Sequence, residues 1–468
     1  MTMSFYDQLE HYGANTAILT EGGEHTSYAA LAEASDRLTE HVASRRVGFL
    51  LCENQLESVV GYLGFLRRRA VPVLINSSMD AALYAELFKA YRPAYVYLPA
   101  ERGADMPGCR LLATCGGYRL FETACEQNYQ VHDDLGLLLT TSGSTGSPKL
   151  VRLSYRNIDS NAGAIAEYLG ISSADRPMTT MPMSYTFGLS IINSHLLRGA
   201  SLVLTDATLM DKRFWQTLKE QQVTTFSGVP YIFEMLKKLR FARMDLPSLK
   251  YLTQAGGKLN PELSAEFAEV CEAKSIAFIV MYGQTEATAR MSYLPREYAR
   301  SKAGSIGIAI PGGRFWLTDD SGKVIEDAET VGELWYQGDN VSLGYATNCA
   351  DLNKGDENKG ILQTGDMAKR DSDGFYYIVG RKNRFLKLFG NRVNLDEVEH
   401  LLRDAGYDCA CAGVDDKLTI YVTQKDSQAQ ILKMISERTG INPHGFVIAY
   451  IDKIPRNEAG KITYTALG

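Results

Sequence analysis

The sequence lacks an excess of positive charge. Its 468 residues include 49 Lys and Arg against 55 Asp and Glu, which gives a formal net charge of −6 at pH 7. Proteins that bind the phosphate backbone of nucleic acids concentrate basic residues on one face. Nucleic-acid binding is therefore disfavoured, and the 45% hydrophobic and 22% charged residues are ordinary for a soluble globular protein.

Long apolar runs are also missing. A membrane-spanning helix requires roughly 18–20 consecutive apolar residues, and no run in this sequence approaches that length. The opening MTMSFYDQ has no basic stretch followed by an apolar one, which a secretory signal would have. We therefore expect a cytoplasmic protein with no membrane partner.

Cysteine is sparse and scattered. Only Cys409 and Cys411 lie close together among the eight cysteines, and no His sits nearby to complete a zinc set. We therefore expect the free thiols of a reducing cytosol, with a structural disulfide as the less favoured alternative.

Short apolar runs alternate with helical stretches through the first two thirds of the chain. This alternation predicts βαβ units and a largely parallel sheet, with a helix at residues 58–69. The predicted strands are residues 47–51, 70–75, 95–98, 137–141, 201–204, 223–226, 251–253 and 278–281.

The pattern changes after about residue 305. Residues 314–318 and 332–336 indicate antiparallel hairpins, and Asp373-Gly374 is a turn signal before a strand at 375–378. The segment 351–360, rich in Asp, Asn, Lys and Gly, is expected to be a flexible surface loop.

The last 85 or so residues are typical of a small α+β module. Asn394 followed by Glu397 resembles a capping box that opens a helix through Leu402. Two strands, 418–422 and 446–451, flank a helix near 430–437. These features place a domain boundary between residues 382 and 383.

A loop rich in hydroxyls follows one of the predicted strands. Residues 140–149 read TTSGSTGSPK: glycines allow close approach of the backbone to a polyphosphate, hydroxyls donate hydrogen bonds, and lysine offsets charge. A Walker A loop does not fit, because Pro148 precedes Lys149 and Leu150 stands where Ser or Thr is required. Taken alone, a polar Ser/Gly loop without function would be common.

Further segments combine groups that suit a nucleotide. MYGQTE at 281–286 supplies an aromatic ring, a glycine, a hydroxyl and a carboxylate, which is a hard oxygen ligand for a metal ion. Asp366 in a Thr-Gly-Asp turn could accept hydrogen bonds from a vicinal diol. Each has an ordinary alternative, such as a helix cap or a surface turn, and most lysines near a terminus, such as Lys461 in IPRNEAGKI, are merely solvated.

In this order and spacing, from about Leu137 to Lys461, the segments resemble the motifs of the adenylate-forming (AMP-binding) superfamily. That superfamily includes acyl- and aryl-CoA ligases, peptide-synthetase adenylation domains and luciferase-like enzymes. The resemblance implies an α/β fold: a large N-terminal domain of two α/β subdomains plus a distorted β-barrel (1–382), and a small mobile C-terminal α+β domain (383–468). The hinge falls at Asn383.

The resemblance also implies roles for individual residues. Tyr282 would stack on adenine, Thr285 would contact the α-phosphate and Glu286 would hold Mg²⁺. Lys461 would bridge the substrate carboxylate and the α-phosphate, so the catalytic residues are Lys461, Thr285 and Glu286. The implied ATP-binding residues are Thr141, Ser142, Gly143, Ser144, Thr145, Gly146, Lys149, Gly256, Gly257, Tyr282, Gly283, Asp366 and Arg381. A further block, Gly332-Glu-Leu with Gly338 and Gly344-Tyr345, also resembles the family and is interpreted as structural.

The acid substrate is less well defined. Tyr185 stands where the family places an aromatic gate, although a core tyrosine fits nearly as well. Amino-acid-activating relatives have Asp at the next position, where this chain has Thr186; a neutral hydroxyl is a weak counter-ion, so an α-amino acid is disfavoured. The candidate pocket residues are Tyr185, Ser227, Val229, Ala255, Gly256 and Ala287, and they do not name an acid.

The implied function is ATP-dependent activation of a carboxylic acid to an acyl-AMP, with release of pyrophosphate, followed by transfer to a phosphopantetheine thiol. Residues 387–394 are closer to carrier-loading members, which favours a separate carrier protein over CoA. The alternatives are a ligase that uses free CoA, direct amide or ester formation, and a non-enzymatic nucleotide-binding scaffold. The scaffold is disfavoured because Lys461, Thr285 and Glu286 are all present. The implied cofactors are ATP and Mg²⁺, with CoA or carrier phosphopantetheine as acceptor.

Overall fold

The computed structural model describes residues 4–102, 108–140, 149–388, 391–414, 417–425, 427–439, 442–456 and 462–467. The chain forms two compact units. The first contains Met1–Phe315 and Tyr336–Leu362, and the second contains Trp316–Trp335 and Gln363–Gly468. Both mix helices with sheets, so the expected α/β class is confirmed.

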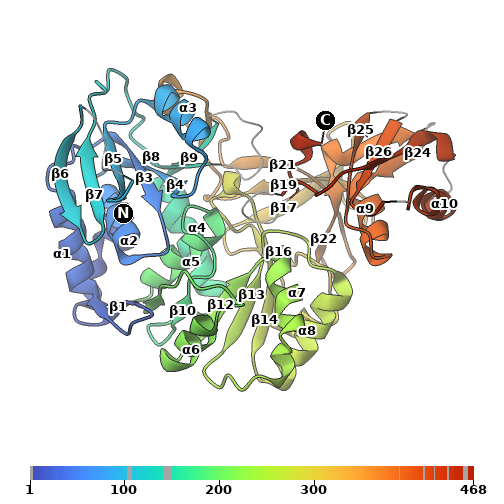
Figure 1. The fold of residues 1–468 in the computed structure, drawn as a ribbon, viewed down its shortest axis with the longest axis horizontal. Coiled ribbons are helices and arrows are strands. Elements are labelled where there is room, and N and C mark those ends of the chain that lie inside the picture. The colour runs from blue at the N-terminus through green and yellow to red at the C-terminus, as the bar shows by residue number, and fades with distance from the viewer. Residues whose placement is uncertain are drawn as a thin grey trace. The chain divides into compact units, whose positions relative to one another are not determined.

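A nine-stranded sheet forms one half of the first unit. Its central strands β10, β11, β12, β13 and β14 are parallel, as the alternation of short apolar runs with helices predicts. Helices α7 and α8 lie against strands β12 to β14 (Figure 1). The strand order is β16 (Ile308–Ala309), β15 (Ser292–Tyr293), β14 (Ala277–Tyr282), β13 (Tyr251–Gln254), β12 (Thr225–Gly228), β10 (Pro177–Met178), β11 (Leu202–Val203), β1 (Thr16–Leu19) and β2 (His25–Ser27). The helices that follow its strands are α5 (Thr186–Leu196), α6 (Lys212–Glu220), α7 (Pro230–Lys238) and α8 (Pro261–Ala273).

An eight-stranded sheet forms the other half of this unit. Every residue of β3 is buried, and apolar clusters cover both faces of the sheet. The strand order is β20 (Gly344–Ala346), β9 (Leu150–Ser154), β8 (Leu135–Thr140), β4 (Val71–Asn76), β3 (Val47–Cys52), β5 (Tyr95–Pro99), β7 (Tyr118–Glu122) and β6 (Arg110–Cys115). The helices of this half are α1 (Tyr28–Leu38), α2 (Leu56–Arg67), α3 (Ala81–Tyr91) and α4 (Tyr155–Tyr168).

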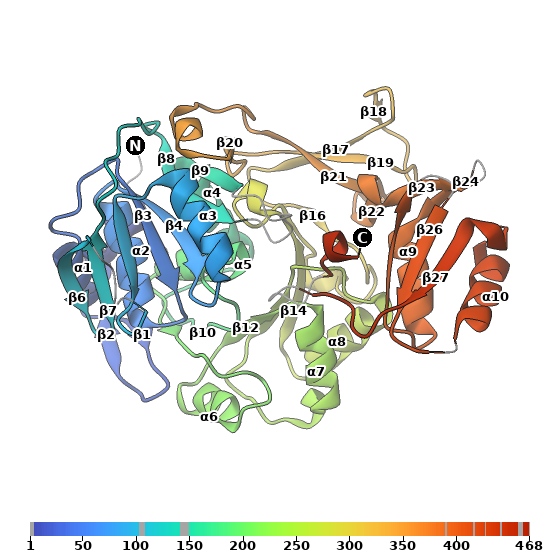
Figure 2. The same cartoon turned by 45° about the horizontal axis from the view of Figure 1, so that its top comes forward.

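The chain enters and leaves the second unit through a five-stranded sheet, in which β17 pairs antiparallel with β18 and β21 with β22. A three-stranded sheet follows, and α9 and α10 lie side by side on it (Figure 2). Asn394 caps α9 by accepting a hydrogen bond of 3.0 Å from the amide of Asp396, at the predicted helix start. The bounds are β17 (Arg314–Thr318), β18 (Val324–Ile325), β19 (Gly332–Gln337), β21 (Ile361–Arg370), β22 (Tyr376–Arg381), β23 (Phe385–Leu388), β24 (Asn391–Asn394), α9 (Leu395–Asp404), β25 (Cys409–Val414), β26 (Lys417–Val422), α10 (Gln428–Thr439) and β27 (Phe446–Tyr450).

The segment 351–360 differs from the expected flexible loop. It begins inside a short 3-10 helix, Cys349–Asn353, and the side chain of Leu352 is buried. The guanidinium of Arg152 donates to the carbonyls of Lys354 and Gly355 and lies 2.5 Å from the Glu357 carboxylate. The composition is typical of a flexible loop, but the contacts of the buried Arg152 on strand β9 hold this segment in place.

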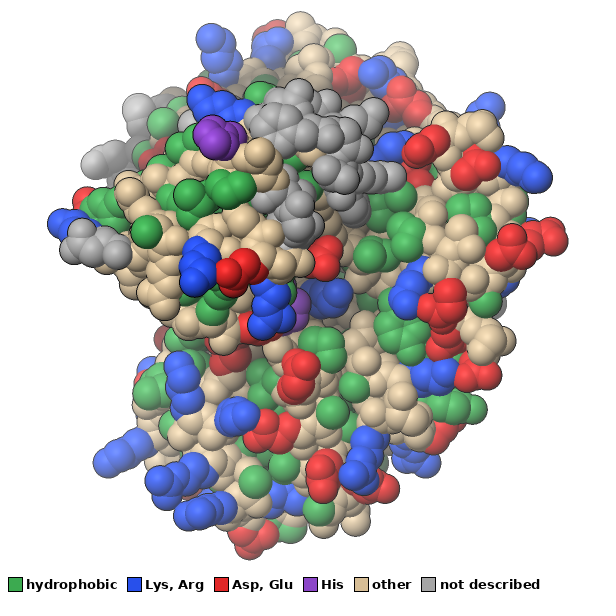
Figure 3. All heavy atoms as spheres, turned by 90° about the vertical axis from the view of Figure 1, so that its right-hand side faces the viewer, with side chains coloured by type: hydrophobic (Ala, Val, Ile, Leu, Met, Phe, Trp, Pro, Cys, Tyr) green, Lys and Arg blue, Asp and Glu red, His purple; other side chains and the backbone are tan. Residues whose placement is uncertain are grey.

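Three expectations from composition can be compared with the structure. All eight cysteines are free thiols. No helix within the described ranges is long and apolar enough to cross a membrane. On the face shown in Figure 3, acidic and basic side chains are interspersed, in keeping with the slightly negative net charge.

Candidate active site

The candidate site is built at the carboxyl ends of parallel strands. Ser227 on β12 pairs with Thr253 on β13, and Gln254 on β13 pairs with Val280 on β14. The three strands therefore end at one edge of the sheet. In open α/β sheets, this edge is where ligands bind.

Residues predicted for the acid pocket meet at this edge. Gly256 has φ +81°, and a Cβ there would lie 2.9 Å from Cγ1 of Val229 and 3.2 Å from Oη of Tyr185. Only glycine therefore fits between these two side chains. Ala255 packs in the same apolar cluster as Val229. Gln254 holds the turn by donating a 2.9 Å hydrogen bond to the carbonyl of Gly257.

Ser227 and Ala287 are more deeply placed. The hydroxyls of Ser227 and Thr253 share a hydrogen bond of 2.7 Å, and both residues are buried. Ala287 is completely buried.

The Tyr-Gly-Gln-Thr-Glu segment follows β14 without a break. Tyr282 is the last residue of the strand, and a Cβ on Gly283 would lie 1.6 Å from the carbonyl oxygen of Ala289, so no side chain can be accommodated there. Thr285 and Glu286 then lie in a short 3-10 helix, Thr285–Ala287. The hydroxyl of Thr285 is 3.5 Å from that of Thr186. Thr186, which follows the predicted gate Tyr185, therefore faces Thr285, the residue predicted to contact the α-phosphate.

Asn340 holds this turn through hydrogen bonds, a role that no sequence motif indicated. Its amide nitrogen lies 2.9 Å from the carbonyl oxygens of both Ala287 and Arg290, and its own carbonyl accepts from the hydroxyl of Thr288 at 2.7 Å. Thr288 has a left-handed backbone (φ +63°), which costs energy for a β-branched residue. The three hydrogen bonds hold that conformation and so fix the position of Glu286.

Tyr345 connects two of the predicted site residues. Its hydroxyl donates a 2.7 Å hydrogen bond to Oε1 of Glu286. The ammonium of Lys149 lies 3.4 Å from the centre of its ring, which is a close cation–π contact. Strand β20, which carries Tyr345, pairs with β9, which begins one residue after Lys149. The block interpreted as structural therefore contributes a side chain to the site.

The donor set suits magnesium. Glu286 offers a carboxylate next to the hydroxyl of Thr285, and Mg²⁺ is commonly held by one or two carboxylates together with substrate phosphates. Across the described part of the chain there is no cluster of three or more His, Cys, Asp or Glu that could form an all-protein metal cage. The residues present therefore fit a Mg²⁺ ion that arrives with a nucleotide.

The second unit brings together the other two predicted nucleotide contacts. Strands β21 and β22 pair Asp366 with Arg381, and Nε of Arg381 lies 2.8 Å from Oδ1 of Asp366. Asp366 is 3% exposed. Thr364 orients the turn, since its hydroxyl accepts from the Asp366 amide (3.1 Å) and donates to the carbonyl of Leu334 (2.7 Å).

The remaining predicted positions are the hinge residue and the residues of two segments outside the described ranges. Asn383 lies in a short 3-10 helix, Lys382–Arg384. The predicted residues outside the described ranges are Thr141, Ser142, Gly143, Ser144, Thr145, Gly146 and Lys461.

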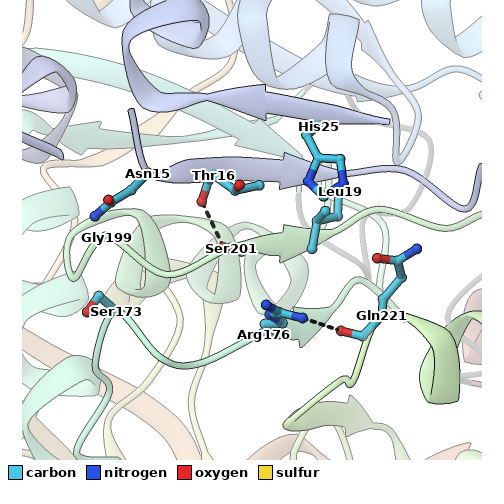
Figure 4. Close-up of a pocket in the computed structure, with 9 residues that line it drawn as sticks. All are labelled: Asn15, Thr16, Leu19, His25, Ser173, Arg176, Gly199, Ser201 and Gln221. Atoms are coloured by element: carbon cyan, nitrogen blue, oxygen red, sulfur yellow. Dashed lines mark hydrogen bonds between the residues drawn. The ribbon is translucent and has the colours of Figure 1, made fainter. Parts of the chain in front are cut away.

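A cavity of about 330 Å³ lies in another part of the first unit, away from the candidate site. Figure 4 shows its lining, in which Ser201 donates to the carbonyl of Thr16 and Arg176 donates to the carbonyl of Gln221. Thr16 begins β1, while Arg176 and Ser201 directly precede β10 and β11. The cavity therefore includes the amino ends of β10 and β11, at the edge opposite the candidate site, and extends along β1 to Leu19.

Comparison with known proteins agrees with this geometry. The profile of the family described as AMP-binding enzyme matches residues 5–346. The 2-succinylbenzoate–CoA ligase of Bacillus licheniformis is 28% identical over 341 residues, which are 70% of this chain and 69% of that protein. The sulfoacetate–CoA ligase of Cupriavidus necator is 29% identical over 348 residues, which are 70% of this chain and 66% of that protein. The chain thus spans about two thirds of the length of these curated relatives.

A solved structure extends the likeness of the fold. The o-succinylbenzoate CoA synthetase of Bacillus subtilis, in complex with its acyl-adenylate intermediate, has a TM-score of 0.80 at 21% identity, over 99% of this chain and 97% of that one. The resemblance inferred from the motifs is confirmed. The chain belongs to the AMP-binding enzyme family and is an adenylate-forming ligase.

Proposed function

We propose that the protein activates a carboxylic acid with ATP to give an acyl-AMP and pyrophosphate, and then transfers the acyl group to a phosphopantetheine thiol. The observation that carries the proposal is the group formed by Lys149, Tyr345 and Glu286 beside Thr285. It combines a cation, a positioned carboxylate and a hydroxyl. This is the set of groups that a triphosphate and its Mg²⁺ require.

In the first step, the substrate carboxylate attacks the α-phosphorus of ATP and pyrophosphate leaves. Negative charge spreads over the phosphoryl oxygens, so the contribution of the protein is to position the partners and stabilise that charge. Mg²⁺ held by Glu286 would supply positive charge when bound. Thr285 donates to the α-phosphate, Lys149 lies near the leaving pyrophosphate, and Lys461 bridges the carboxylate and the α-phosphate.

The nucleoside would be bound by two sets of residues. In the first unit Tyr282 would stack on adenine, and in the second unit Asp366 would accept from the ribose hydroxyls with Arg381 beside it. Asp366 is already oriented by Arg381 and Thr364, so little ordering is left to the moment of binding.

In the second step, a thiolate attacks the acyl carbonyl and AMP leaves. Both CoA and carrier proteins present the same phosphopantetheine thiol. The relatives named as CoA ligases support CoA, and the likeness of residues 387–394 to carrier-loading members supports a separate carrier. Rotation of residues 383–468 about Asn383 between the two steps is part of the proposal.

Carboxylate-dependent ATP–pyrophosphate exchange tests the first step, run with Mg²⁺ over a panel of fatty, aryl, hydroxy, amino and di-acids. We expect exchange with one class of acid, and then thioester formation when CoA or a phosphopantetheinylated carrier is added. Exchange with no acid, from protein that binds ATP, would contradict the proposal.

The role of Lys461 has its own test. Lys461→Ala should lower the exchange rate by roughly 100- to 1000-fold, because one donor aimed at the transition state contributes about 3–4 kcal/mol. ATP binding should remain. Lys453→Ala, which removes an exposed lysine nearby, is the matched control. Normal pyrophosphate release from Lys461→Ala would refute the assignment.

A further inference from the structure

Arg290 is a buried cation near the residues predicted for the acid pocket. It lies four residues after Glu286 and is 3% exposed. Its guanidinium carbon is 3.9 Å from the centre of the Phe187 ring. Phe187 in turn faces Gly256, whose added Cβ would meet Cδ1 of Phe187 at 3.9 Å and Oη of Tyr185 at 3.2 Å. Arg290 is thus separated from the Tyr185–Gly256 wall of the pocket by a single aromatic ring.

The charge of Arg290 has no carboxylate partner within the described ranges. Burial lowers the pKa of its guanidinium, and the groups that act against this are the phenol of Tyr168, which is hydrogen-bonded to Arg290, and the phenol of Tyr185. An arginine side chain nevertheless stays protonated in a protein. Within the same part of the chain, its Nε has no hydrogen-bond partner. A buried cation that lacks an anion is unfavourable, and a ring face compensates only part of that cost.

Two other buried arginines show how this chain neutralises such a charge. Arg152 is completely buried, and its guanidinium donates to backbone carbonyls and lies 2.5 Å from the carboxylate of Glu357. Arg384, in the second unit, lies 2.8 Å from Asp396 and 2.5 Å from Glu399. Each has at least one carboxylate, and Arg290 differs from both.

The surroundings of Arg290 favour a small polar ligand group. The residue lines a cavity of about 10 Å³ together with Ser190, Ser227 and Thr253. That volume holds about one water molecule, so an anionic ligand group reaches Arg290 only when the side chains that line the cavity move apart. The hydroxyls of Ser227 and Thr253 share one hydrogen bond, so one of the two still has a proton to donate.

The backbone holds Arg290 firmly in place. Its carbonyl accepts two hydrogen bonds of 2.9 Å, from the side-chain amides of Asn161 and Asn340. The side chain therefore projects from a fixed point on the segment that carries Thr285 and Glu286.

We propose that Arg290 determines acid specificity by pairing with a second anionic group, so that the substrate is a short carboxylic acid bearing a further carboxylate or sulfonate. The inference rests on the proposed function, because it concerns the acid that is adenylated. The reacting carboxylate faces Thr285, and the distal anion completes the polar end formed by Arg290, Ser227 and Thr253. An acid without the distal anion leaves the buried guanidinium unpaired, which a site built for that pair rejects strongly.

Isosteric acids test the proposal. Exchange is measured with succinate against succinamate, glutarate against glutaramate, phthalate against phthalamate and 3-sulfopropionate against its sulfonamide. In each pair the two compounds match in size and differ by one negative charge. We expect kcat/KM for at least one dianion to exceed that of its neutral-ended partner by about 100-fold or more. The carboxylate and sulfonate pairs distinguish the two kinds of anion.

Two variants locate the preference. Arg290→Met keeps the length of the side chain and removes the charge, so the preference should fall to within a few-fold. Arg290→Lys keeps the charge and should retain part of it. Arg176→Met, at the opposite edge of the sheet, is the control and should behave like the unaltered protein. If Arg290→Met does not fold, the paired acids on the unaltered protein and on Arg290→Lys still decide the question.

The outcomes separate the two proposals. Exchange that favours neutral-ended acids, or treats both members of every pair alike, overturns the role of Arg290 and leaves adenylation intact. A preference for dianions that persists in Arg290→Met also overturns it. Exchange with no acid at all removes the proposed function and this inference together.

Discussion

Tyr345→Phe removes one oxygen atom from the candidate site and leaves the ring in place. The lost interaction is the 2.7 Å hydrogen bond from the hydroxyl to Oε1 of Glu286, while the ring under the Lys149 ammonium remains. A hydrogen bond to an ionised group contributes about 1.5–3 kcal/mol. Tyr345 is 37% exposed, so water replaces part of the loss, and we expect about 1.4 kcal/mol, a tenfold effect.

The effect should appear in the requirement for Mg²⁺. A hydrogen-bond partner that orients a metal-binding carboxylate typically changes metal affinity by about 10- to 100-fold. In ATP–pyrophosphate exchange with saturating ATP, the Mg²⁺ concentration for half-maximal rate should rise about tenfold in Tyr345→Phe. The rate at saturating Mg²⁺ should recover most of its original value.

Two further variants make the comparison sharp. Tyr345→Leu also removes the ring beneath Lys149, and the lost cation–π contact, about 0.5–1 kcal/mol at an exposed site, should add a rise of a few-fold in KM for ATP. Tyr231→Phe, on a tyrosine that is 58% exposed on α7, should change neither quantity. If Tyr345→Phe keeps its Mg²⁺ requirement within twofold, the hydroxyl does not position Glu286 and the reasoning is wrong.

Three other perturbations follow from the structure. Arg152→Met should lower the free energy of unfolding by about 3 kcal/mol, because several buried carbonyls lose their hydrogen-bond donor. Urea unfolding measures this change. In the control Arg156→Met, where the side chain that is lost is 74% exposed in its ion pair, the free energy of unfolding should change by no more than about 1 kcal/mol. Burial lowers the pKa of His195 to about 4, so between about pH 6.5 and 4 the unfolded chain binds a proton that the folded chain excludes. The free energy of unfolding should therefore fall by up to roughly 3 kcal/mol as the pH drops through this range. In His195→Gln the free energy of unfolding should depend less on pH, and an equal dependence in both proteins would count against the argument. Asp366→Asn should raise KM for ATP about tenfold and abolish discrimination against 2′-deoxy-ATP in the exchange assay, whereas discrimination that persists would show that the ribose is bound by other residues.

Local pattern was sufficient for most of the elements that carry the site. The predicted strand 278–281 lies within β14, and Asn394 caps α9 at the predicted helix start, although its hydrogen bond comes from the Asp396 amide and not from the Glu397 amide that a capping box would use. These predictions succeed because hydrophobic period and capping chemistry act over a few neighbouring residues. Gly283 was predicted to bind ATP, and the structure adds a different reason for a glycine there, because the backbone approaches Ala289 so closely that no other residue fits.

Residues that reach the site through tertiary pairing could not be predicted in this way. Tyr345 and Glu286 are 59 residues apart in the chain and meet only in the folded structure, where β20 also pairs with β9 next to Lys149. Asn340 likewise comes from beyond β19 to hold the Thr-Glu turn. A single polar residue in a loop has no local feature that distinguishes a clamp from a solvated side chain.

The difference between the two halves of the site follows from their ligands. ATP has a fixed set of phosphates, ribose and base, so its contacts collect into short runs such as the segment that ends in Thr285 and Glu286. The proposed acid pocket would draw single residues from separate elements: Phe187 from α5, Ser227 from β12, Gly256 after β13 and Arg290 after β14. When each element contributes a single residue, the pocket residues do not form a sequence motif. The sequence could therefore indicate the pocket only through the family resemblance, and it could not identify the acid that binds there. Once the chain is folded, charge becomes the informative quantity, because a buried guanidinium is costly unless an anion meets it. Arg290 is for that reason the residue from which the acid should be identified.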